Sequence, residues 1–338
     1  MEEPRAELCP RSLRDAADLP GLHAVLALQH GEAVLEAYFS GIDERIGSPP
    51  APVQLGPDVA HDLRSITKTV VGLLCGVLVT ERAIDVHTPL RELLPQRRSD
   101  FTPASAALTL HHVLTMSMGL EWDESFSYAD PRNSEIAMAL STDRVAYVLG
   151  RPSAEPPGTR WRYCGGATEL LAEVITSLSG ASLVDFASER LFAPLGLRSA
   201  AWSGDPKGPY AASGLRLTAR ELACIGQLLL HQGSWQGRQV LPRSWLTSAL
   251  RTHIAIEEGF GYGYHAYLGS VRSGERAVAY VAGIGNGGQW LYVLPELDAS
   301  VAIYCGNYND WTLTRELPGK VLREHVLPLL AAGAPQRS

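Results

Sequence analysis

Alternating apolar and polar positions predict β structure at both ends of the chain. The stretch "LHAVLALQHGEAVLEAYFSG" (22–41) holds two such runs around "QHGE", which predicts a β-hairpin. Four more short runs follow near the other end, without helical patterns between them, which favours an antiparallel sheet. These runs are "YGYHAYLGS" (262–270), "RAVAYVAG" (276–283), "QWLYVLPE" (289–296) and "ASVAIYCGN" (299–307). The Pro- and Gly-containing stretch 47–57 predicts a loop.

The middle of the chain has helical signals instead. A helix is predicted to begin near Ser65, and another has Thr109 as its N-cap with Gly119 near its end. Gly180 is placed as the C′ glycine of a third helix, and Thr218 with Glu221 forms a capping box. A last helix is predicted in 316–330, against the sheet.

These elements predict an α+β fold with an antiparallel β-sheet built from both chain ends and flanked by helices. We expect residues 1–64 and 250–338 to form the sheet region, and residues 65–249 to form a mainly helical inserted region. The two would act as one functional unit, with the ligand site in the cleft between them.

Composition narrows the class of protein. The chain has 338 residues, 46% of them hydrophobic and 19% charged, which is ordinary for a globular protein. A net charge of -7 argues against nucleic acid as a partner. The start lacks an apolar signal region, and no run reaches the ~18 apolar residues of a membrane span. The five cysteines are scattered without a C-x-x-C pair, so we expect a cytoplasmic protein with no structural zinc.

The stretch "DLRSITKTVVGLLCGVL" (62–78) carries the strongest chemical signal. Lys68 follows Ser65 by three residues, so the two share one face of the predicted helix. A free lysine is a poor base because its pKa is ~10.4, but burial beside apolar side chains lowers that pKa and yields a neutral amine. Arginine, which this chain otherwise prefers, stays protonated and could not remove the serine proton. The pattern thus favours a Ser65 nucleophile with Lys68 as its base. The alternative is that Ser65 only caps the helix and that Lys68 is exposed to solvent.

Two further stretches add candidate groups. Tyr163 lies in "EPPGTRWRYCGGATELL" (155–171) just before a helix, where a phenol near a lysine can relay a proton; a packing role with Trp161 is the alternative. "VAGIGNGGQWLYV" (281–293) matches G-x-G-x-x-G, but a β run follows it, which excludes the dinucleotide motif. A glycine turn between strands can instead direct a backbone N–H into a cleft, which with the Ser65 N–H would form an oxyanion hole.

Other nucleophiles and metal sites find less support. Cys164 beside Tyr163 has no base spaced to activate it. His111 and His112 lack H-E-x-x-H spacing, and no G-x-S-x-G elbow is present. We therefore expect neither a metal nor a cofactor.

The motifs together resemble those of the penicillin-recognising serine hydrolases, the superfamily of class C β-lactamases, DD-peptidases, family VIII esterases and 6-aminohexanoate-oligomer hydrolases. "SITK" resembles the S-x-x-K element, "RYCGG" the Y-x-N element, and "AGIGNGGQ" the K-T-G strand with its following loop. The resemblance covers nearly the whole chain and is greatest with the esterase and oligomer-amide branches. Further connecting segments resemble the superfamily: "LHHVLTMSMGLEWDE", "EPPGTRWRY", "LFAPLGL" and "GLRLTARELACIGQLLL".

The resemblance implies roles for individual residues. Ser65 would be the nucleophile, Lys68 its base and Tyr163 the proton relay, and Gly285 would supply the second oxyanion N–H, within one residue toward Ile284. Gly165 stands where Y-x-N has Asn, and Ala282 where K-T-G has Lys, so efficient β-lactam turnover is not expected. The loop "EWDESFSYADP" (121–131) would cover the cleft, or serve only as a structural anchor. Candidate substrate-binding residues are Trp122, Glu124, Tyr128, Gly165, Ile284 and Asn286.

The expected function is hydrolysis of small-molecule esters or amides through an acyl-enzyme on Ser65. A β-lactamase or DD-peptidase is one alternative, and a catalytically silent binding or sensor protein on the same scaffold is another. The expected partner is the small-molecule substrate, with no membrane, no nucleic acid and a possible homodimer.

Overall fold

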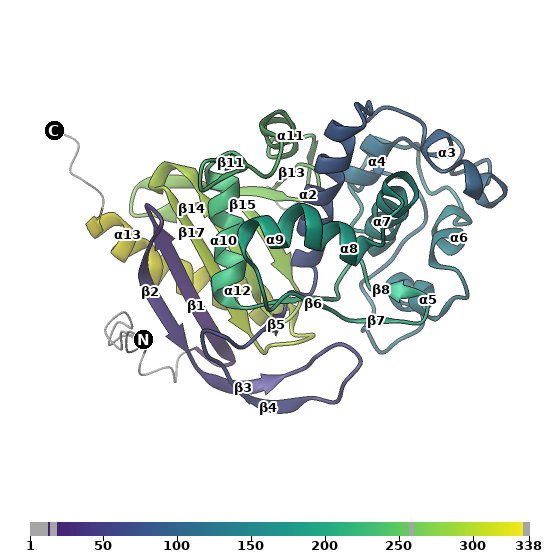
Figure 1. Cartoon of the computed structure of the whole chain (residues 1–338). Helices are drawn as coiled ribbons and strands as arrows, with labels where there is room; N and C mark the ends of the chain where they lie inside the picture. The colour runs from purple at the N-terminus through teal and green to yellow at the C-terminus, as the bar shows by residue number, and fades with distance from the viewer. Residues whose placement is uncertain (1–12, 14–18, 257–259, 334–338) are drawn as a thin grey trace.

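A large antiparallel sheet, in the left part of Figure 1, is the main β structure of the molecule. The computed structural model describes residue 13 and residues 19–256 and 260–333. The eight strands of the sheet lie in the following order across it: β12 (Ile254–Ala255), β13 (Gly261–Tyr262), β14 (Tyr267–Ser273), β15 (Arg276–Gly285), β16 (Gln289–Leu294), β17 (Ala299–Cys305), β1 (Leu22–Gln29) and β2 (Glu32–Tyr38).

Both ends of the chain build this sheet, as the sequence predicts. Strand β1 pairs antiparallel with β17 from Leu22 opposite Cys305 to Gln29 opposite Ala299. Between β1 and β2 the chain turns through His30 and Gly31, whose φ angles of 51° and 80° suit a two-residue turn of the mirror-image type. The predicted hairpin and the predicted α+β class are both confirmed.

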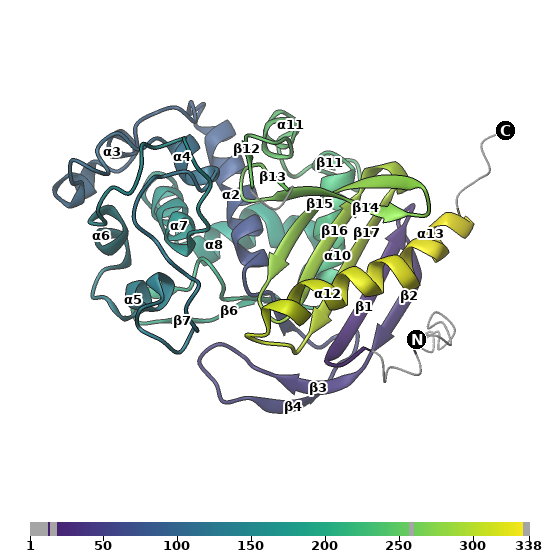
Figure 2. The same ribbon diagram turned by 180° about the vertical axis from the view of Figure 1, so that it is seen from behind.

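Helices cover both faces of the sheet (Figures 1 and 2). On one face, α2 (Ile66–Glu81) and α10 (Ala219–Leu230) pack on inward-facing residues such as Leu26 and Leu291. On the other face lie α12 (Trp311–Val321), the π-helical segment η5 (Leu322–Val326) and α13 (Leu327–Gly333). Because both faces are buried, successive residues such as Val25 and Leu26 are both apolar although they point to opposite faces.

The 3₁₀ turn η4 (Pro295–Leu297) joins β16 to β17, and the other helices gather beside the sheet, around α2 and α7 (Gly165–Ser179) (Figure 1). They are α3 (Leu90–Leu93), η2 (Pro95–Asp100), α4 (Leu110–Leu114), α5 (Ser134–Leu140), α6 (Arg144–Leu149), α8 (Leu183–Ala187), η3 (Ser188–Phe192), α9 (Ala193–Leu195) and α11 (Arg243–Ala249). Helix α10 belongs by sequence to the predicted helical insertion but packs on β16, β17 and β1. The division into 1–64 with 250–338 and 65–249 stays a proposal.

Local capping signals locate several helix ends correctly. Thr109 and Thr218 cap α4 and α10 with their side chains, and Gly180 ends α7 with a φ of 76°. Helix α4 stops at Leu114, well before the predicted end near Gly119, because Met116 already has a φ of 52°.

Short strand pairs complete the fold. The predicted loop 47–57 contains β4 (Ala51–Gln54), which pairs with β3 (Ser40–Asp43), so the loop prediction was wrong there. The other short strands are β5 (His61–Asp62), β6 (Ala201–Trp202), β7 (Gly204–Asp205), β8 (Gly208–Pro209), β9 (Leu215–Leu217), β10 (Ser234–Trp235) and β11 (Arg238–Gln239). Within the described residues no single helix has the length and apolarity to cross a membrane, although the bent pair Gly165–Ser179 and Leu183–Leu195 meets those two criteria together.

Candidate active site

Ser65 and Lys68 meet at the first turn of α2. Ser65 is the N-cap residue, and Lys68 Nζ lies 3.0 Å from Ser65 Oγ. The ammonium also donates to the carbonyl oxygen of Ala212 at 3.0 Å, and only 2% of the Lys68 residue is exposed. Arg64, just before the serine, has a φ of 49°, a left-handed conformation that non-glycine residues hold mainly where surrounding contacts enforce it. The contact predicted from the S-x-x-K spacing is therefore present.

Tyr163 completes a three-residue cluster with Ser65 and Lys68. It lies on the loop before α7, and packing of α7 on α2 brings its ring centre to 5.0 Å from Lys68 Nζ. Burial raises the pKa of Tyr163 to about 12, while the nearby Lys68 charge and hydrogen bonding to Ser65 oppose this rise. Trp161 packs on the tyrosine with ring centres 6.1 Å apart, so the anchoring contact considered as an alternative exists as well.

Glu135 is the functional candidate that the sequence analysis missed. It lies in the first turn of α5, buried, with Oε2 3.7 Å from Lys68 Nζ. No hydrogen-bond partner for this buried Oε2 is found among the described residues. No local motif marks Glu135, because its contact with Lys68 joins residues 67 positions apart.

The prediction that the Lys68 amine is neutral did not take the nearby carboxyl groups of Glu135 and Glu124 into account. Burial by itself would lower the pKa of Lys68, but the electrostatic effect of nearby acidic groups, Glu135 first and then Tyr163 and Glu124, outweighs burial and raises the pKa. This shift favours the protonated amine in the free protein. The sequence argument considered only the apolar neighbours on α2 and not the acidic segment that folds over it.

Glu124 lies beside Glu135, with which it interacts unfavourably. Burial and then the Glu135 charge raise the pKa of Glu124 to about 8, which Lys68 partly offsets. Glu124 accepts hydrogen bonds from Trp122 Nε1 at 2.6 Å and from Tyr128 Oη at 3.1 Å. Trp122 is only 4% exposed, so its buried indole holds the Glu124 carboxylate in place through this hydrogen bond.

Gly165, the departure from the Y-x-N pattern, leaves room for these carboxylates. Its N–H donates to Glu124 Oε1 at 2.6 Å, and a Cβ at this position would lie 2.6 Å from Glu135 Oε2. A side chain at residue 165 could not coexist with Glu135 in its present position. The absence of a side chain at Gly165 thus makes room for the buried Glu135 carboxylate.

The end of β15 approaches the start of α2 through two glycines. A Cβ on Gly283 would lie 3.0 Å from Ile66 Cγ2, and a Cβ on Gly285 would overlap the carbonyl oxygen of Leu63. Only glycine permits this approach, which carries the Gly285 backbone next to the residues that precede Ser65. Gly287 and Gly288, with φ angles of 91° and 92°, then turn the chain into β16.

A cavity of about 300 Å³ opens over Ser65. Tyr128, Glu135 and Asn286 line it, as do residues 44–48 and Tyr210, which the sequence analysis did not select. Asn286 is fixed by Asn309, whose N–H donates to Asn286 Oδ1 at 2.9 Å and whose Oδ1 accepts from Asn286 Nδ2 at 3.0 Å. Ile284 instead lines a second cavity on the other side of β15.

The remaining candidates from the sequence have structural partners. Burial raises the pKa of the Cys164 thiol well above its usual value, so it is a poor nucleophile. His112 completes the α4 capping box, and His111 Nδ1 lies 3.1 Å from Tyr264 Oη. In the part of the chain that the structure describes, no group of three or more His, Cys, Asp or Glu side chains is arranged to hold a metal ion.

Comparison with known proteins places the chain in a family. The family model described as Beta-lactamase matches residues 11–311. The chain belongs to the beta-lactamase family. It is 27% identical over 310 residues to the 6-aminohexanoate-dimer hydrolase of Paenarthrobacter ureafaciens, covering 85% of this chain and 73% of that protein.

Solved structures of low sequence identity share the fold of this beta-lactamase-family protein. A putative 6-aminohexanoate-dimer hydrolase from Bacillus anthracis superimposes with a TM-score of 0.74 and 23% identity, over 90% of this chain and 79% of that one. EstCE1, a hydrolase with promiscuous acyltransferase activity, gives a TM-score of 0.67 and 15% identity, over 91% and 96% of the two chains. The family and these relatives identify the protein as a serine hydrolase of the amide- or ester-cleaving type.

Beneath Ser65 the hydrolase contains a second set of polar and charged groups, buried or half-buried and here called the support network: His23, Asp43, His61, Asp62, Arg64, Arg216 and Tyr308. Arg216 donates to Asp62 Oδ1 at 2.5 Å and to Asp43 Oδ2 at 2.8 Å. Arg64 Nε lies 3.6 Å from Asp62 Oδ2, and the Arg64 guanidinium stacks over the Tyr308 ring at 4.6 Å. These contacts hold the strained residue immediately before the nucleophile.

Two histidines close this network. His61 Nδ1 lies 3.0 Å from the carbonyl oxygen of Asp62, which only accepts, so this nitrogen carries the proton. His61 Nε2 then accepts from His23 Nδ1 at 3.0 Å. Burial lowers the pKa of His61 to about 4 against the opposing effect of Asp43, so both the geometry and the surroundings of His61 favour its neutral form.

Proposed function

We propose that this hydrolase cleaves small-molecule esters or amides through an acyl-enzyme on Ser65, with Lys68 and Tyr163 as its proton-transfer groups and the N–H groups of Ser65 and Gly285 as its oxyanion hole. The observation that supports this most is the 3.0 Å contact between Lys68 Nζ and Ser65 Oγ inside a closed cluster with Tyr163. A nucleophile with a base in hydrogen-bond reach is the general requirement for such chemistry.

The raised pKa of Lys68 requires a proton acceptor before the amine can act as a base. The acidic pair Glu124 and Glu135 meets this need, because Glu135 Oε2 lies 3.7 Å from Nζ and the pKa of Glu124 is about 8. Transfer of one ammonium proton to this pair yields the neutral amine, which then accepts the Ser65 proton as Oγ attacks the carbonyl carbon. Tyr163 protonates the departing alcohol or amine, and a water activated by the same groups releases the acyl group.

The assignment is tested with Ser65→Ala and a nitrophenyl ester. We expect kcat/KM to fall by at least roughly 10³-fold, since loss of a nucleophile leaves only binding and oxyanion stabilisation. A fluorophosphonate probe should label the wild-type chain and not the variant, with the labelled peptide containing Ser65. Substantial turnover by Ser65→Ala, or labelling at another serine, would refute the assignment.

β-Lactam turnover is the activity from which this proposal must be separated. Ala282, where K-T-G has Lys, is 1% exposed and pairs with Tyr267 and Tyr292 within the sheet, so it offers no charge to a substrate carboxylate. We expect slow or no hydrolysis of nitrocefin beside rapid ester hydrolysis. A cytoplasmic location and a homodimer stay predictions from the sequence.

A further inference from the structure

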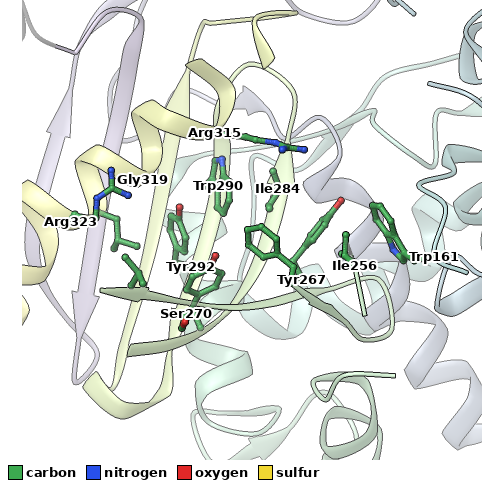
Figure 3. A pocket seen from close by; sticks show the side chains of 14 residues that line it. Trp161, Ile256, Tyr267, Ser270, Ile284, Trp290, Tyr292, Arg315, Gly319 and Arg323 are labelled. Carbon is green, nitrogen blue, oxygen red and sulfur yellow. The ribbon is translucent and has the colours of Figure 1, made fainter. Parts of the chain in front are cut away.

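A second cavity, of about 270 Å³, lies between the sheet and α12, and its lining includes six aromatic side chains together with aliphatic residues, Ser270, Gly319 and two arginines (Figure 3). We call it the aromatic groove and define it by Trp161, Tyr267, Tyr280, Ile284, Trp290 and Tyr292. These residues come from strands β14, β15 and β16 and from the loop that carries Tyr163. None of them is used by the proton transfers described above.

The rings of the groove are already fixed in place. Trp290 stacks on Tyr292 with centroids 4.7 Å apart, and Tyr292 meets Tyr280 edge-on at 5.2 Å. Trp290 Nε1 donates to the carbonyl oxygen of Thr314 at 2.9 Å, which ties the indole to α12. A preformed site of this kind spends little conformational entropy on binding.

One end of the groove adjoins the catalytic cluster. Trp161 contacts the Tyr163 ring at 6.1 Å and the Tyr267 ring at 6.3 Å. Ile284 immediately precedes Gly285, the proposed oxyanion donor. The groove lies on the face of β15 opposite Ser65, and Trp161 and Ile284 connect it to Tyr163 and Gly285 at the end of that strand, where a leaving group would pass from one face to the other.

We propose that the aromatic groove binds the leaving group of the substrate and selects alcohols or amines that carry an aromatic ring system. This inference rests on the proposed function. In the step concerned, Ser65 Oγ forms a bond to the carbonyl carbon, the bond from that carbon to the leaving oxygen or nitrogen breaks, and the Tyr163 proton passes to the leaving atom. The groove exceeds the roughly 150 Å³ that accommodates a benzene ring, so a fused pair of rings is a suitable probe.

Two isomeric esters test which side of the substrate enters the groove. 2-Naphthylmethyl acetate carries the rings in its leaving group, methyl 2-naphthylacetate carries them in its acyl group, and ethyl acetate has none. We expect kcat/KM to be at least about tenfold higher for 2-naphthylmethyl acetate than for either of the others, which is the order of discrimination that an apolar pocket supplies.

Variants that narrow the groove should reduce this preference. Ser270 is exposed on β14 and lines the cavity, so Ser270→Trp adds a ring there, whereas Arg272→Trp adds the same ring two residues further along the strand. Gly319→Leu is the second variant, because a Cβ on Gly319 meets only the flexible guanidinium of Arg323, at 3.1 Å. We expect Ser270→Trp and Gly319→Leu to lower the ratio of naphthylmethyl to ethyl acetate turnover about tenfold, and Arg272→Trp to leave that ratio unchanged.

The outcomes separate this inference from the proposed function. Equal kcat/KM for all three esters, or a preference for methyl 2-naphthylacetate that the groove variants abolish, would overturn the leaving-group assignment and leave the hydrolase assignment intact. Absence of hydrolysis of every ester, and of the corresponding acetamides, by the wild-type protein would overturn both. In Ser65→Ala, calorimetry should detect 2-naphthylmethanol binding that Gly319→Leu weakens; binding unaffected by Gly319→Leu would also count against the groove.

Discussion

Two clusters of charged and polar groups adjoin Ser65, and their charges are arranged in opposite ways. Around Lys68, the carboxyl groups of Glu124 and Glu135 lie together and share a single cation. In the support network, Arg216 alternates with Asp43 and Asp62, so opposite charges are neighbours. Two neighbouring carboxyl groups compete for one proton, which can therefore move between them. Alternating positive and negative side chains instead hold one another in fixed positions. The first region is suited to proton movement and the second to fixing the nucleophile.

The two regions also respond to pH in opposite directions. Glu124 has a folded-state pKa of about 8, above its ordinary value, so the folded protein loses stability as pH rises and the unfolded chain ionises first. His61 has a folded-state pKa of about 4, below its ordinary value, so its contribution is present above the unfolded pKa and is lost as pH falls toward 4. Glu124 thus limits stability on the alkaline side and His61 on the acid side.

Lys68→Arg should have the largest effect in the proton-transfer region. Arginine keeps the positive charge beside Glu135 but cannot become a neutral base, so we expect kcat to fall by roughly 10³-fold or more with the fold retained. Ester turnover and circular dichroism measure the two parts of this prediction.

The matched control is Lys207→Arg, at a lysine whose Nζ bonds the carbonyl oxygen of Ser141 at 2.8 Å away from the cluster. Its kcat should match that of the wild type. Turnover by Lys68→Arg within a few-fold of this control would show that the amine never needs to lose its proton.

Asp62→Asn should have the largest effect in the support network. The change removes a charge shared by Arg216 and Arg64, and loss of one member of a buried ion pair costs about 3–5 kcal/mol of unfolding free energy. Glu36→Gln, which breaks the more exposed pair with Arg220, should cost about 1 kcal/mol or less. Urea unfolding measures both, and equal losses would mean that the network does not carry the stability assigned to it.

Local patterns of the sequence predicted the parts of this site that depend on neighbours in the chain. The hairpin turn at His30 and Gly31, the capping box at Thr218 and the spacing of Ser65 and Lys68 all act over a few residues. The prediction that Lys68 is neutral was wrong because its pKa depends on Glu135, which the fold brings close from 67 residues away. The same reason explains why Asp62 and Arg216, 154 residues apart, left no sequence signal.

Glu135→Gln should change the pH dependence more than the fold. Without this charge, which is the largest contribution raising the pKa of Lys68, that pKa falls and the pH–rate profile should move toward lower pH. We also expect kcat/KM near neutral pH to fall by roughly tenfold, since the proposed proton acceptor is lost. Glu135→Asp retains the charge and should restore most of the profile. A uniform loss at every pH in Glu135→Gln would indicate a structural role only.

Glu124→Gln tests the contrast in pH response directly and should have the smallest effect. The amide cannot ionise, so the fall in unfolding free energy between pH 5 and pH 8 should be smaller than in the wild type by about 1 kcal/mol or more. The acid limb, to which His61, His111 and His265 contribute through their lowered pKa values, should stay in place because no interaction with Glu124 shifts the pKa of these histidines. Urea unfolding at a series of pH values measures both limbs. If the substitution moves the acid limb equally, the two regions are not independent, and the separation between proton transfer and positioning does not hold.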